Sequence, residues 1–119
     1  MSIIERRSEQ RVPAAIEVRV FGLDAEGTRF EQGAIAANIS FGGALLAGLA
    51  QTLRPSDLVV VRYRQKQACF RVVWTRNSGN ERKIQAAVQR RETDECPWEE
   101  LLAARAAVAR IYKESRAEP

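Results

Sequence analysis

Short extended segments separated by turn residues are the feature of this sequence that most restricts its fold. In residues 15–22, the apolar side chains of Ile16, Val18 and Val20 alternate with charged ones, as expected for a strand that buries one face. The same reading gives further extended segments at 28–38, 58–64, 68–76 and 83–89, with a short apolar stretch at 44–50. Turn-forming sequences (DAEG, SFGG, RPSD and NSGNE) lie between them. This succession predicts an antiparallel sheet or barrel.

The last segment changes period. From Pro97 onward, apolar residues recur at spacings of three and four, namely Trp98, Leu101, Leu102, Val108, Ala109 and Tyr112. Pro97 suits a first helical turn, and Glu99 and Glu100 lie near the positive end of the helix dipole. We therefore predict an amphipathic helix over 97–116, packed on or near the barrel, with a role in binding a partner or a second copy as the alternative.

Composition indicates a single soluble domain. The chain has 119 residues, 45% of them apolar and 29% charged. No stretch approaches the roughly 20 apolar residues that span a bilayer, and no secretory signal is visible, so we expect a cytoplasmic protein.

The residues with metal-binding or catalytic chemistry are few. Cys69 is interpreted as a buried, inert thiol in a strand, and Cys96 as a structural residue before the helix. With two cysteines and no histidine, we expect no metal site and no cofactor. The lack of histidine also removes the usual general base, and we do not expect an enzyme.

Arginine dominates the positive charge. The net charge is +4, and sixteen arginines stand against three lysines. Arginine binds phosphate through a planar fork and stacks on bases, although a GC-rich genome also favours its codons. Three arginines, Arg6, Arg7 and Arg11, gather in the polar segment ERRSEQRVP before the first strand. Residues 1–12 are therefore either a solvated basic tail or an arm that holds an anion.

A second motif, NISFGG, follows the second expected strand. Asn38 and Ser40 are two residues apart and would face the same side of an extended chain. Gly42 and Gly43 would permit positive φ and let a ligand approach the backbone. Alone, the segment is equally typical of an ordinary turn.

Together, Arg7-x-x-x-Arg11 and Asn38-x-Ser40-x-x-Gly43 resemble the two motifs of the PilZ domain family, receptors for cyclic di-GMP. The VVW strand at 72–74 is a further similarity, and the resemblance spans roughly residues 5 to 112. Asparagine in place of the commoner aspartate at 38 is one departure, and RPSD where the family usually has a glycine is another. A late strand without the family's Gly-x-x-Phe pattern is a third.

The resemblance implies a bacterial second-messenger receptor. Its fold would be a six-stranded antiparallel β-barrel over 13–92, with a C-terminal helix and a flexible N-terminal arm. The arm's Arg6, Arg7 and Arg11 would wrap over cyclic di-GMP, while Asn38, Ser40, Gly42 and Gly43 would meet it from the barrel. An arginine at position 6 would favour a stacked pair of ligands, and the signal would pass to an unidentified protein.

Three further points remain open in the sequence. Trp74 is interpreted as a core residue, with a place in the site as the alternative. Arg62, Arg64, Arg71 and Arg76 could form one basic face or a solvated surface. A PilZ-like interaction protein without ligand binding, or a nucleic-acid-binding barrel, are the alternative functions, and the protein could be a monomer or a homodimer.

Overall fold

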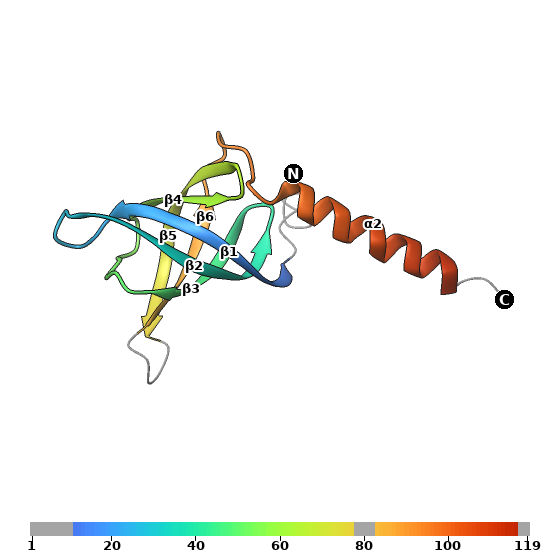
Figure 1. The fold of residues 1–119 in the computed structure, drawn as a ribbon, viewed down its shortest axis with the longest axis horizontal. Helices are drawn as coiled ribbons and strands as arrows, with labels where there is room; N and C mark the ends of the chain where they lie inside the picture. Colours follow the sequence, from blue (N-terminus) through green and yellow to red (C-terminus); the bar gives the residue numbers. More distant parts are fainter. Residues whose placement is uncertain (1–10, 78–82, 117–119) are drawn as a thin grey trace.

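The computed structural model describes residues 11–77 and 83–116, which form six strands and one long helix (Figure 1). The strands are β1 (Val12–Leu23), β2 (Arg29–Ser40), β3 (Gly43–Leu49), β4 (Leu58–Tyr63), β5 (Lys66–Asn77) and β6 (Ile84–Arg90). The helix is α2 (Glu99–Arg116). Each of the extended segments expected from alternation contributes a strand.

The six strands close into a barrel. Their order is β1-β2-β3-β6-β5-β4, and every neighbouring pair is antiparallel. Closure comes from β1 and β4, which pair from Arg19 opposite Arg62 to Gly22 opposite Val59. The predicted six-stranded antiparallel barrel with a C-terminal helix is therefore confirmed.

The barrel interior is filled by aliphatic side chains from all six strands and closed by one tryptophan. Trp98 is fully buried, and its ring centre lies 5.5 Å from that of Phe70 on β5. Its indole Nε1 donates to the carbonyl of Ser40 at 2.7 Å, so the polar edge of the ring is satisfied. Trp98 thus belongs to the barrel core and ties the segment before α2 to the end of β2.

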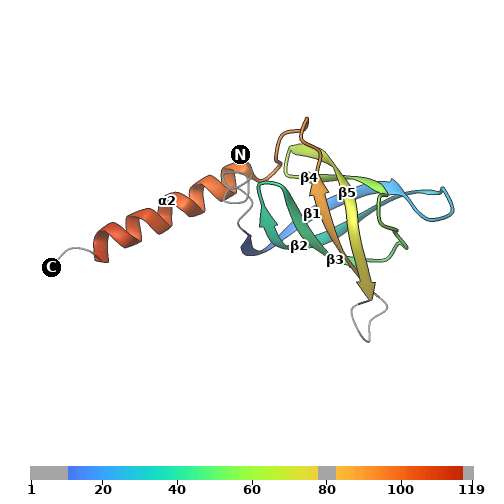
Figure 2. The ribbon, with the colours of Figure 1, turned by 180° about the vertical axis from the view of Figure 1, so that it is seen from behind.

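The helix packs apolar side chains on the barrel only in its first turn, and one turn later Arg105 donates from Nη1 to the Pro13 carbonyl of β1 at 2.8 Å. Leu101 and Leu102 contact the core cluster, whereas the side chains of residues 103–115 are exposed. Figures 1 and 2 show α2 pointing away from the barrel in both views. The start of the helix thus lies on the barrel, whereas the apolar side chains further along it are not covered by the described part of the chain.

The two cysteines differ in their surroundings. Cys96 is buried before α2, as expected for a structural residue, whereas Cys69 is only partly buried on β5, contrary to its interpretation as a core thiol. Among the described residues, no helix is long and apolar enough to cross a membrane, and no cluster of metal-ligating side chains is found.

Candidate functional site

The NISFGG motif forms the tight turn between β2 and β3. Ser40, the last residue of β2, pairs with Gly43, the first residue of β3. The Ser40 hydroxyl accepts a hydrogen bond from the Gly43 amide at 3.1 Å and lies 3.4 Å from the Gly43 carbonyl. Because Ser40 is only 3% exposed, its side chain mainly fixes the shape of this turn.

Gly43 is required by close strand packing. A Cβ atom at this position would lie 2.3 Å from the carbonyl oxygen of Val88 on β6, so any larger residue would push the two strands apart. Among the described residues, the glycines with positive φ are Gly27 and Gly48. The prediction that positive φ explains the motif's glycines is therefore wrong for Gly43, where space between β3 and β6 is the reason.

Arg90, at the end of β6, holds the same turn from outside. Its Nε donates to the Phe41 carbonyl at 2.8 Å, and its guanidinium carbon lies 4.5 Å from the centre of the Phe41 ring. Its Nη1 donates to the carbonyls of Arg91 and Asp94, and its amide donates to the Gly42 carbonyl at 2.7 Å. Sequence reasoning missed Arg90, because 49 residues separate it from Phe41.

A hollow of about 300 Å³ lies beside this turn on the outside of the barrel. It joins the end of the arginine arm, the motif turn and strands β5 and β6. Its lining is Arg11, Ser40, Gly42, Gly43, Val73, Trp74, Ala87, Val88 and Gln89. Four predicted site residues, Arg11, Ser40, Gly42 and Gly43, therefore line the same hollow.

Trp74 lines this hollow because β5 contains a bulge. The register between β5 and β6 shifts between Val72 and Trp74, so one extra residue is inserted there. Regular alternation would point Trp74 inward like Val72, but Val73 and Trp74 are 43% and 41% exposed. The interpretation of Trp74 as a core residue is therefore wrong, and it forms an apolar wall of the site.

Two further arginines flank this wall on β5. Arg76 lies with its guanidinium carbon 5.4 Å from the Trp74 ring centre and donates from Nε to Gln85 at 2.7 Å. Arg71 donates from Nη2 to the Oε1 atom of Gln89 at 2.7 Å. With Arg11 exposed on the other side, the hollow combines a planar aromatic surface with nearby positive charge.

Asn38 lies close to the base of the arm. It pairs with Pro13 on β1 and with Leu45 on β3, and a register irregularity separates it from Ala36. Ile39 is buried in the barrel, so alternation puts Asn38 and Ser40 on the opposite side of β2. Asn38 is not among the described residues that line the hollow. Arg6 and Arg7 lie outside the described residues, so only Arg11 of the predicted arm is placed.

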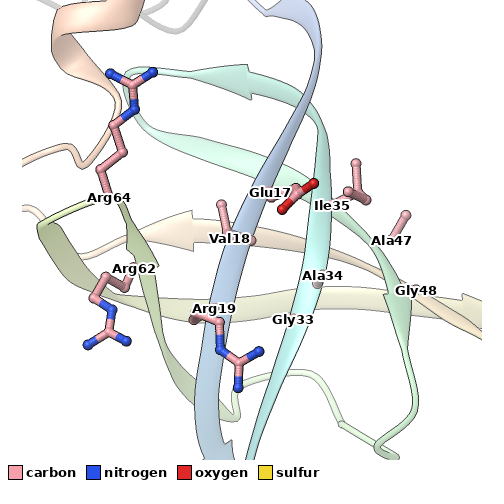
Figure 3. Close-up of a pocket in the computed structure, with 10 residues that line it drawn as sticks. All are labelled: Glu17, Val18, Arg19, Gly33, Ala34, Ile35, Ala47, Gly48, Arg62 and Arg64. Atoms are coloured by element: carbon pink, nitrogen blue, oxygen red, sulfur yellow. The ribbon is translucent and has the colours of Figure 1, made fainter.

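A second, larger hollow of about 530 Å³ lies over β1 to β4 and contains none of the motif residues that the structure describes (Figure 3). Arg62 and Arg64 line it, and Figure 3 shows their guanidinium groups pointing away from each other. Arg19 in the same hollow pairs with Glu31 at 3.0 Å. Arg71 and Arg76 lie beside the first hollow, next to Gln89 and Trp74. The four strand arginines therefore do not form one basic face.

The chain is similar to one protein family and to solved structures. The family model described as PilZ domain matches residues 5–107. Among solved structures, the chain is similar to the PilZ domain of CeSA from a cellulose-synthesizing bacterium, with 20% identity and a TM-score of 0.49. That match covers 69% of this chain and 80% of the other. A search of curated proteins gave no match.

Proposed function

Since the chain belongs to the PilZ domain family, we propose that it is a receptor for cyclic di-GMP whose ligand lies in the hollow beside the β2–β3 turn. PilZ domains bind ligands and do not catalyse reactions. The observation that carries the proposal is the meeting of Arg11 with Ser40, Gly42 and Gly43 in a single hollow. These residues come from both family motifs, which lie far apart along the chain.

The chemistry of the hollow suits a cyclic dinucleotide. Its two phosphates need cations, and its two guanines need flat apolar surfaces and polar partners for their edges. Arg11 can pair with a phosphate or bridge guanine O6 and N7. The exposed Trp74 ring offers a stacking surface, and Gln89 can reach a base edge.

The arm completes the site in this proposal. Arg6 and Arg7 would close over the ligand from residues 1–12, and Asn38 would meet them near the base of the arm. Ordering a chain segment costs about 1–2 kcal/mol per residue in backbone entropy. Hydrogen bonds to charged groups return about 1.5–3 kcal/mol each, so a cluster of arginines is needed rather than one. The closed arm would then present a new surface to a partner protein.

Isothermal titration calorimetry with cyclic di-GMP tests the proposal, with GTP and single-stranded DNA as competing ligands. We expect binding to cyclic di-GMP alone, and its loss in Arg7→Ala and Arg11→Ala without a change in the thermal melt. Arg29→Ala, an exposed arginine at the start of β2, is the matched control and should bind like the parent. Parent-like binding by Arg7→Ala or Arg11→Ala would show that the site is assigned to the wrong residues. Tight binding of DNA would favour the nucleic-acid alternative.

The number of ligands is a separate part of the proposal. Arg6 precedes the Arg7-x-x-x-Arg11 motif, and we propose that it supports a stacked pair of cyclic di-GMP molecules. The same titration should then give two ligands per protomer in the parent and one in Arg6→Ala. A stoichiometry of one in the parent would contradict this part and leave the site itself unaffected.

A further inference from the structure

The projecting part of α2 carries apolar side chains into solvent. Val108 and Ile111 are 64% and 61% exposed, although both belong to the residue types that are most often buried. Residues 103–115 span about 20 Å at 1.5 Å per residue. A single helix of this length without tertiary packing is only marginally stable in water. The projecting segment therefore gains stability from any surface that covers it.

The apolar side chains form one stripe. Leu101, Ala104, Val108 and Ile111 follow each other at alternating spacings of three and four residues, and Ser115 continues the series. This is the a and d pattern of a helix that packs lengthwise against another helix. The small Ala104 leaves room there for a large residue from a partner.

The stripe runs into a groove at the base of the helix. The groove measures about 790 Å³ and lies between the β4–β5 hairpin and the start of α2. Its lining is Tyr63, Arg64, Gln65, Lys66, Pro97, Glu100, Leu101 and Ala104. Because Leu101 and Ala104 belong to both, the groove and the stripe form one continuous surface.

We propose that this surface binds α2 of a second copy of the chain, with the two helices antiparallel. In such a pair, a positions lie opposite d positions, so Ala104 of one copy faces Val108 of the other and Leu101 faces Ile111. The C-terminal half of each helix then lies in the groove of the other copy. This extends the exposed stripe of each helix into a shared apolar seam.

Charge supports the antiparallel direction. The Nζ atom of Lys66 lies 3.7 Å from the Oε2 atom of Glu100. Glu100 lies on one flank of the stripe, and Glu114, two heptads later, lies on the same flank. In an antiparallel pair like flanks meet, so Glu114 of the partner arrives beside Glu100, where Lys66 and Arg64 supply two positive charges for the two carboxylates. The helix C-terminus, with its partial negative charge, approaches the same two cations. A parallel pair would place the two helix dipoles side by side in the same direction and leave these cations unused.

The pairing surface is small, so we expect a reversible dimer. Interfaces below about 1,200 Å² belong to weak or transient complexes. A dissociation constant on the order of 10 µM is therefore expected for the full chain without ligand.

Sedimentation velocity between about 1 and 200 µM tests the dimer. The parent should shift from monomer to dimer over this range, and Val108→Glu should remain monomeric. Ala106→Glu adds the same charge to the opposite side of the helix and should dimerise like the parent. A monomeric parent at every concentration, or a dimer that persists in Val108→Glu, would overturn the proposal.

Disulfide trapping tests the direction. In a Cys69→Ser background, Ala104→Cys and Val108→Cys proteins should cross-link to each other when mixed, and each should cross-link poorly with itself. Efficient self-linking through position 104 would show a parallel pair and contradict the proposal. Far-ultraviolet circular dichroism of every variant checks that α2 still forms.

Discussion

The guanidinium of Arg90 lies against the Phe41 ring at 4.5 Å and donates to the Phe41 carbonyl at 2.8 Å. One side chain thus holds both the ring and the backbone of the residue at the tip of the β2–β3 turn. The same guanidinium bonds the 91–94 loop, so it joins two segments from different parts of the chain. The turn that carries the family motif is therefore held in place by a residue outside the motif.

Replacing Arg90 by lysine tests this relationship. Lysine keeps the charge but lacks the planar fork that serves several carbonyls at once. We expect Arg90→Lys to lower the free energy of unfolding by about 1–2 kcal/mol and to weaken cyclic di-GMP binding about tenfold. Arg19→Lys, which alters an exposed pair with Glu31, should change both quantities little. Equal effects of the two substitutions on binding would contradict a special role for Arg90.

The two tryptophans should separate binding from stability. Trp74→Ala removes an exposed ring, and we expect affinity for cyclic di-GMP to fall about ten- to a hundredfold with less than about 1 kcal/mol of destabilisation. Trp98→Ala leaves a cavity in the barrel core and should lower the free energy of unfolding by about 3–5 kcal/mol. Urea denaturation and calorimetry measure the two effects. Unchanged affinity in Trp74→Ala would remove the tryptophan from the site.

Two glycine-to-alanine changes should differ in sign. In Gly43→Ala the new methyl group would meet the Val88 carbonyl at 2.3 Å, and we expect a loss of about 1–3 kcal/mol. In Gly33→Ala the nearest atom is the Arg19 guanidinium at 3.4 Å, an ordinary contact. That variant should be as stable as the parent or up to about 1 kcal/mol more stable. Similar melting temperatures for the two variants would contradict the packing argument for Gly43.

The pH dependence of stability should report the burial of Cys96. Burial raises the pKa of the Cys96 thiol, so the folded protein holds this proton more tightly than the unfolded chain. The resulting stabilisation is complete below the ordinary thiol pKa and is lost as the pH rises through the higher folded value. Between pH 7 and pH 10, the parent should therefore lose more stability than Cys96→Ala. If urea titrations showed the free energy of unfolding falling equally with pH in the two proteins, burial of Cys96 would not be the cause.

The strands could be predicted from the sequence because each depends on a local pattern of apolar and polar residues. Alternation in AIEVRVFG gives β1, and the Asp24–Thr28 turn that follows is closed by local hydrogen bonds to the Asp24 side chain. Ser40 and Gly43, which the sequence motifs group with Arg11, line the same hollow as Arg11 in the structure. The strand and the turn depend on residues that lie close together along the chain, whereas the grouping of Arg11 with the β2–β3 turn came from the resemblance to the two family motifs.

The predictions failed where contacts with a segment distant in the sequence determine how a residue is oriented or packed. A bulge opposite β6 turns Trp74 outward, and alternation within β5 alone cannot reveal it. Gly43 is glycine because of the carbonyl of Val88 on another strand. Helical spacing identified α2. Among the apolar residues of this helix, however, only Leu101 and Leu102 pack against the barrel core.

The bulge in β5 makes the site depend on strand register as well as on residue identity. Val72 pairs with Val88 and Trp74 with Ala87, so Val73 is the extra residue that lets the indole face outward. A homologue of the same length without the bulge would pair Trp74 with Ala86 and turn the indole into the barrel, while every motif residue stayed in the sequence. A motif search would accept that homologue, although its site would lack the aromatic wall.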